Sequence, residues 1–98
     1  DIDENIYKNK LEREIAQTLR ELGHKVRAGV EIAGLSADLL VDDKFVIEVD
    51  GVEDSERPTV SNMKKQSIIE RSGFKVNRVT YREWQYSSKA CLDRLLVN

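Results

Sequence analysis

Cysteine and histidine are almost absent from this chain, which contains one of each, Cys91 and His24. A single cysteine excludes a disulfide within the chain and a zinc site built from several thiolates. A single histidine excludes a histidine-rich metal site and leaves little room for histidine-based acid-base catalysis. Because disulfides accumulate in oxidising compartments, one thiol favours the cytoplasm or another reducing intracellular compartment.

Long apolar segments are also lacking. No apolar run reaches the length needed to cross a membrane, and the first residues, Asp-Ile-Asp-Glu-Asn, do not resemble a signal peptide, so we expect no membrane partner. The length of 98 residues predicts one domain, residues 1–98, with a modest core. The abrupt, charged start predicts a domain excised from a larger protein, whose other domains are then expected partners.

Charge is unevenly distributed, although the formal net charge is only −2. Residues 31–56 contain nine acids and one base, a net charge of −8, whereas residues 57–82 contain seven bases and one acid, a net charge of +6. An acidic segment beside a basic one suits a site that binds cations next to a polyanion. An ordinary solvated surface would give the same counts, so both interpretations stay open.

The spacing of apolar residues predicts helices and strands in a definite order. Gly29 and Gly34 mark a bulge or turn in the first strand. The expected elements are a helix at 11–22, a strand at 24–31, two strands flanking a turn at 42–44, a helix carrying Met63, Ile68 and Ile69, a strand at 75–80, a turn at 81–84 and a helix around 90–96. This α-β-β-β-α-β-α order predicts an α/β (α+β) domain with a mixed central sheet flanked by helices.

Three acids lie in or beside the two strands of the hairpin. Side chains alternate along a strand, so Glu48 and Asp50 share one face while Ile47 and Val49 share the other. Pairing around residues 42–44 brings Asp38 of the preceding strand near Glu48. Clustered carboxylates repel one another unless a cation lies between them, and oxygen-only ligands suit Mg²⁺ or Mn²⁺. The alternative is that the acids face solvent on a half-exposed sheet.

The order of elements, with Asp38 on the second strand and Ile-Glu-Val-Asp-Gly at 47–51 on the third, resembles the PD-(D/E)xK nuclease superfamily and its restriction-endonuclease-like core. Three stretches resemble its branch of very-short-patch-repair-like endonucleases and RAP domains. They are Leu-Glu-x-x-Ile-Ala-x-x-Leu-Arg-x-x-Gly at 11–23, Lys-Gln-x-x-Ile-x-x-x-Gly-Phe-x-Val at 65–76 and Val-x-Tyr-x-Glu-Trp at 79–84. Together these stretches and the strand acids cover nearly the whole chain.

The resemblance implies a metal site. It assigns Asp38, Glu48 and Asp50 to a divalent metal, Mg²⁺ or Mn²⁺, with Glu12 supporting the site from the first helix. Asp50 stands where the superfamily has its lysine, two residues after the acid. No histidine follows residue 51, so the histidine chemistry of the repair-type nickases is not expected.

A lysine of the following helix is expected to replace the missing one. Helical spacing leaves Lys64 and Lys65 open, because each has an isoleucine four residues later, and the match to the branch's helix pattern favours Lys65. The helix must also turn Met63 or its neighbours, and Ile69, toward the sheet. The structural alternative for both lysines is a solvated helix face.

Two functions from different classes follow. The first is a metal-dependent endonuclease that hydrolyses phosphodiester bonds, in DNA rather than RNA, as the cutting module of a larger protein. The second is a non-catalytic RNA-binding module of the RAP type. The joint presence of the acids and a helix lysine favours the enzyme, and the sequence leaves open whether the chain forms a homodimer.

Contacts with nucleic acid are expected along the basic segment. Its bases are Arg57, Lys64, Lys65, Arg71, Lys75, Arg78 and Arg82. A sequence pI of about 5.4 is low for a stand-alone nucleic-acid binder, so weak binding by the chain alone is expected. Trp84, Tyr81 and Tyr86 either stack on bases or belong to the core, and the core is the commoner place for the single tryptophan of a small domain.

Overall fold

The computed structural model describes Tyr7 and residues 9–50 and 60–97. Its elements, in chain order, are α1 (Lys10–Glu21), β1 (Val26–Ile32), β2 (Leu35–Val41), β3 (Phe45–Asp50), α2 (Val60–Arg71), β4 (Lys75–Thr80), α3 (Tyr81–Tyr86) and α4 (Ser88–Leu95). The mixed sheet flanked by helices confirms the predicted fold class and is compatible with a restriction-endonuclease-like core. Within the described ranges, no helix is long and apolar enough to cross a membrane.

The strands form one sheet in the order β1-β2-β3-β4. β1, β2 and β3 are antiparallel neighbours, whereas β3 and β4 are parallel. A parallel pair requires a crossover connection, and α2 lies in it. The β2–β3 turn places Asp42 and Asp43 at φ +53° and +56°, in the left-handed region that aspartate enters more readily than most residues.

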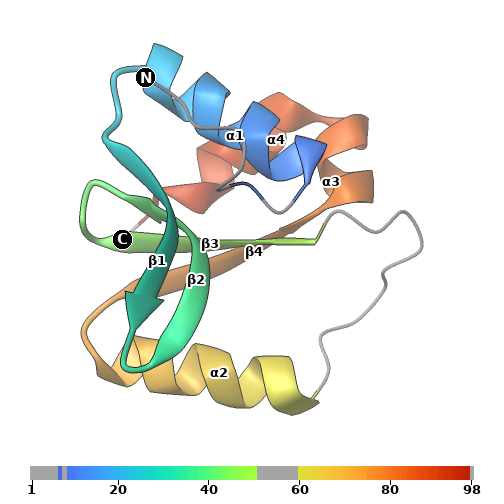
Figure 1. Ribbon diagram of the computed structural model, residues 1–98. Coiled ribbons are helices and arrows are strands. Elements are labelled where there is room, and N and C mark those ends of the chain that lie inside the picture. Colours follow the sequence, from blue (N-terminus) through green and yellow to red (C-terminus); the bar gives the residue numbers. More distant parts are fainter. Residues whose placement is uncertain (1–6, 8, 51–59, 98) are drawn as a thin grey trace.

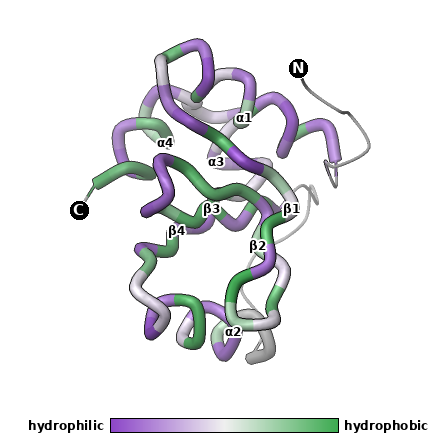
Figure 2. The backbone as a smooth tube through the Cα atoms, turned by 60° about the vertical axis from the view of Figure 1, so that its left-hand side comes forward, coloured by the Kyte–Doolittle hydropathy of each residue, from purple (hydrophilic) through white to green (hydrophobic). Residues whose placement is uncertain are grey.

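Two apolar cores lie on the two faces of the sheet. Figure 1 shows α1, α3 and α4 on one face and α2 on the other. The larger core joins α1, α3 and α4 to the sheet through Leu11, Ile15, Leu19, Leu39, Ile47, Val79, Trp84 and Leu95, among others. The smaller core joins α2 to the other face through Ile32, Ala37, Leu40, Val46, Ile69 and Val76. Figure 2 shows the hydrophobic stretches of β3 and its neighbours between the two helical layers.

The β1–β2 hairpin changes faces at Gly29. Ala28 packs against the larger core, whereas Val30 packs against the smaller one. Gly29 between them has φ +62°, a conformation that glycine adopts without strain. Ala28 pairs with Leu39 and Val30 pairs with Ala37, which leaves Gly29 opposite Asp38 at the bend. The tip of the hairpin therefore curves over α2, as Figure 1 shows.

The chain after β4 forms helix α3, so the expectation of a turn at 81–84 is wrong. The Thr80 hydroxyl accepts the Glu83 backbone N–H, and the Glu83 carboxylate accepts the Thr80 N–H. This reciprocal capping box starts a helix directly after the strand. Trp84 is buried in the larger core, and its indole N–H donates to the carboxylate of Glu14 on α1. Trp84 is therefore a core residue.

Cys91 on α4 is also part of the larger core and is only 4% exposed. Burial raises the pKa of its thiol, and the nearby Glu83 carboxylate raises it further. The Ser87 hydroxyl accepts the Ala90 N–H and so caps the start of α4, four residues before the thiol. The raised pKa keeps the thiol protonated at neutral pH, and a protonated thiol is a weak nucleophile.

Candidate active site

Asp38 and Glu48 are joined through their carboxylates at the point where β2 and β3 stop pairing. The ladder ends at Leu39 opposite Ile47. Beyond it, the Asp38 backbone N–H donates to Glu48 Oε2 at 3.1 Å, and the Val49 N–H donates to Asp38 Oδ2 at 2.8 Å. Each carboxylate thus takes the place of a backbone acceptor on the neighbouring strand, and both are fixed in position next to one another.

Lys65 completes this arrangement from α2. Its Nζ lies 2.8 Å from Glu48 Oε1, and the two side chains are 27% and 8% exposed. Ile69, one helical turn later, is fully buried in the smaller core and fixes which side of α2 faces the sheet. A carboxylate as buried as Glu48 needs charged and hydrogen-bonding partners, and Lys65 and the Asp38 amide provide them.

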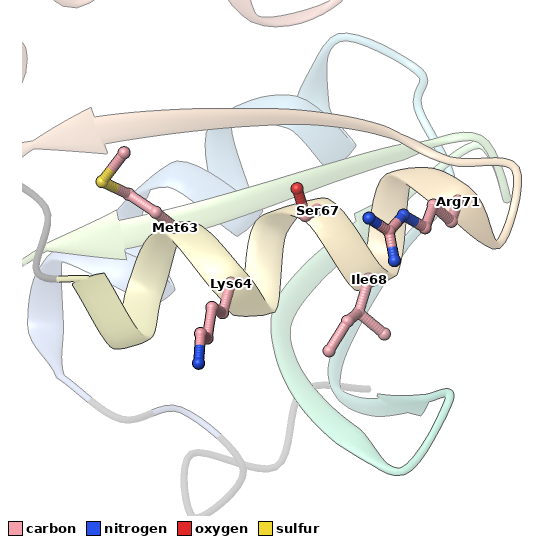
Figure 3. Close-up of a pocket in the computed structure, with 5 residues that line it drawn as sticks. All are labelled: Met63, Lys64, Ser67, Ile68 and Arg71. Carbon is pink, nitrogen blue, oxygen red and sulfur yellow. The ribbon is translucent and has the colours of Figure 1, made fainter.

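Lys64 lies on the outer surface of α2, away from the acids. With Met63, Ser67, Ile68 and Arg71 it lines a shallow groove of about 500 Å³ (Figure 3). The expectation that Ile69 faces the sheet is confirmed, whereas Met63 is 59% exposed and does not face it.

Asp50 and Glu12 lie at the carboxyl end of the parallel strands. Asp50 is half-buried, lies two residues after Glu48 on the same face of β3, and pairs in the ladder with Thr80. Glu12, only 1% exposed, belongs to the first turn of α1, on the opposite face of the sheet from α2. The Trp84–Glu14 contact shows that this part of α1 lies near α3, which follows β4 directly.

The carboxylate oxygens of the candidate site are ligands of the kind that a hard cation such as Mg²⁺ prefers. Within residues 9–50 and 60–97, no group of three or more Asp, Glu, His or Cys side chains is arranged to hold a metal ion. Asp38 and Glu48 are nevertheless a two-carboxylate pair, each oriented by a backbone N–H, and Mg²⁺ commonly binds through one or two carboxylates while keeping several waters. The predicted three-acid metal site stays a prediction.

The aromatic residues divide between core and surface. Trp84 is 5% exposed, whereas Tyr86 is 92% exposed and Tyr81 is half-buried. Stacking by Trp84 on bases would require it to leave the core. The basic segment is divided as well, because Lys65 enters the candidate site, Lys64 faces outward, and Arg57 lies outside the described residues.

Residues 11–98 match the model of the family REase_MTES_1575, a restriction endonuclease-like family. The match fits the PD-(D/E)xK nuclease superfamily that the sequence resembles. The match names no branch of the superfamily, so the resemblance to very-short-patch-repair-like endonucleases and RAP domains stays a prediction. The comparisons with curated proteins and with solved structures gave no match.

Proposed function

The chain belongs to the restriction endonuclease-like family REase_MTES_1575, and from this membership we propose that it is a metal-dependent endonuclease domain that cuts DNA. The observation that supports this function best is the cluster of Asp38, Glu48 and Lys65. The cluster has two carboxylates, each held by a backbone N–H of the neighbouring strand, and a lysine ammonium on one of them. These are groups that metal-dependent phosphodiester hydrolysis requires.

Asp38 and Glu48 are the residues that would hold Mg²⁺ or Mn²⁺. When bound, such an ion neutralises charge on the phosphate and makes a coordinated water more acidic. The backbone amides of Asp38 and Val49 keep the two carboxylates oriented, so the chain itself preorganises the site. In this proposal Asp50 and Glu12 support the site from its edge.

Lys65 is proposed to act on the reacting groups directly. Its ammonium carries three donors, and Glu48 Oε1 takes one of them. The remaining donors can bind a non-bridging phosphate oxygen or orient the attacking water. Asp50 stands at the position where the superfamily has its lysine, so in this proposal Lys65 supplies the ammonium group from α2.

The likeness to very-short-patch-repair-like endonucleases is the reason for proposing DNA as the substrate. The RAP-like alternative, RNA binding without cleavage, predicts that the acids are dispensable. A sequence pI of about 5.4 is low for a stand-alone nucleic-acid binder, so sequence recognition is proposed to lie in other domains of a larger protein.

Cleavage assays test the proposed function. The 98-residue chain is incubated with plasmid DNA, single-stranded DNA and RNA in Mg²⁺, Mn²⁺ or EDTA. We expect DNA cleavage that requires the metal and falls at least about 100-fold in Asp38→Asn, because a ligand is lost while Asn can still accept the Val49 N–H. Asp93→Asn, on the exposed surface of α4, is the matched control. Undiminished cleavage by Asp38→Asn in saturating Mn²⁺ would overturn the assignment.

A further inference from the structure

Arg78 lies beside the acidic pair, on the edge strand β4. In the parallel ladder of β3 and β4 its Cα partner is Glu48, and ladder partners point to the same face. Val76, two residues earlier, packs in the smaller core with α2, so Arg78 also faces the α2 side. Because β2 and β4 flank β3, Arg78 and Asp38 lie on opposite sides of Glu48.

The guanidinium of Arg78 lacks a protein partner in the described part of the chain. The hydrogen bond of this residue outside the sheet uses its backbone carbonyl, which accepts from Arg94. Other described bases without a side-chain partner, such as Lys64, Arg71 and Lys75, are exposed, whereas Arg78 is half-buried. A guanidinium carries five donors, and partly buried donors are normally satisfied. The position is therefore suited to an acceptor that a ligand brings.

The guanidinium of Arg78, free within the described residues, and not the net charge of the acidic pair, points to an anion as that ligand. Asp38 and Glu48 carry two negative charges against the single positive charge of Lys65. A phosphodiester approaching this group brings another negative charge, which the carboxylates repel. Arginine binds phosphate through two parallel N–H bonds, and strands about 4.8 Å apart leave the long side chain of Arg78 within reach of a phosphate at Glu48.

We propose that Arg78 binds a backbone phosphate of the nucleic-acid strand that lies at the acidic pair. This inference rests on the proposed function, because it takes nucleic acid as the ligand. Lys65 reaches Glu48 from α2 and Arg78 flanks it on β4, so the substrate lies over the end of the sheet and not in the outer groove of α2.

Binding without cleavage tests the role of Arg78. A fluorescein-labelled DNA duplex is titrated with the 98-residue chain at low salt without divalent ions, and its anisotropy is measured. Arg78→Ala should weaken binding about tenfold and reduce the slope of log K against log salt concentration by about 1. Arg78→Lys keeps the positive charge but loses the paired N–H donors of the guanidinium, so its affinity should lie between those of Arg78→Ala and the wild type. Lys75→Ala removes an exposed base from the same strand and should change affinity less than about twofold.

Each result decides between the two proposals. Unchanged affinity in folded Arg78→Ala, or an equal loss in Lys75→Ala, overturns the role of Arg78, and metal-dependent cleavage by the wild type then leaves the nuclease standing. Weaker binding by Arg78→Ala without any cleavage by the wild type supports Arg78 and overturns the nuclease. No binding of DNA or RNA by the wild type overturns both. Should Arg78→Ala fail to fold, Arg78→Gln, which keeps most of the side chain, replaces it under the same criteria.

Discussion

A carboxylate that accepts a backbone N–H from another strand has its position fixed by that strand. Asp38 and Glu48 are each held in this way, so the pair is oriented by the chain alone. Lys65 then offsets part of the negative charge from the helix. The site consequently depends on three elements, the β2–β3 hairpin strands and helix α2, which follows later in the chain.

Replacing Lys65 should affect both stability and catalysis. Lys65→Ala leaves Glu48, whose side chain is 8% exposed, without its ammonium partner. We expect a loss of about 1–3 kcal/mol in the free energy of unfolding, measured by urea denaturation. The single-turnover cleavage rate should fall more than about tenfold while DNA affinity changes little.

Lys64→Ala is the matched comparison on the same helix. Because Lys64 lies on the outer surface of α2, away from the acids, its removal should leave stability and the cleavage rate near the wild-type values. The loss of one surface charge should weaken DNA binding less than about twofold. The reverse pattern, a slow Lys64→Ala and an active Lys65→Ala, would move the catalytic role to Lys64.

The sequence could narrow the choice between these lysines but not settle it by spacing. Ile68 and Ile69 are adjacent, so each lysine has an apolar residue one helical turn away. The rotation of α2 about its axis is set by packing against the smaller core. Ile69 is fully buried in that core, whereas Ile68 is 40% exposed. That core contains residues from the hairpin tip, and their arrangement is not a local property of the helix.

At the scale of elements, the hairpin bend determines where Asp38 lies. Val26, Val30 and Ile32 stand at even steps, a pattern that predicts one face of a strand. In the structure Val26 belongs to the larger core and Val30 and Ile32 to the smaller one, because the chain turns over at Gly29. The sequence marks Gly29 as an irregular position. It does not reveal that Asp38 lies opposite Gly29, because that depends on the register between β1 and β2.

Substitutions at Gly29 should show that the bend needs a left-handed residue. Gly29→Ala should lower the free energy of unfolding by about 1–2 kcal/mol, because a Cβ is unfavourable at φ +62°. Gly29→Asn should cost less, since asparagine tolerates this region. Urea denaturation of both variants tests the order, and an alanine variant as stable as the wild type would contradict it.

At the scale of the whole molecule, a cluster of ion pairs lies at the end of the sheet opposite to Asp50. It connects the start of β1 and the residues before it to the β2–β3 turn. His24 Nδ1 lies 2.8 Å from Asp42 Oδ2, while Lys25 and Arg27 bind Asp43 at 3.0 Å. The hydrogen bond with His24 lowers the pKa of Asp42, and the hydrogen bond from Lys25 lowers the pKa of Asp43.

These lowered pKa values predict how acid affects stability. An unfolded aspartate has a pKa of about 3.9, so below about pH 5 the unfolded chain takes up protons before the folded one. The stabilisation from Asp42 is thus present above this range and is lost as the pH falls through the folded value. The stability difference between the wild type and Asp42→Asn should therefore be larger at about pH 5 than at about pH 3. Thermal unfolding at both values measures it, with Asp93→Asn as control, and a difference independent of pH would contradict it.

The buried thiol of Cys91 gives the chain an internal reporter of its own opening. It is the single cysteine in the sequence, is 4% exposed, and lies on α4 in the core shared with α1 and α3. The residue also borders a small surface pocket beside Glu83 and Arg94, so alkylation of the closed chain sets a baseline rate, and separation of these helices raises the rate above it. A change in the alkylation rate between the substrate-bound and the free chain therefore reports on the opening of this helical layer, and no label has to be introduced.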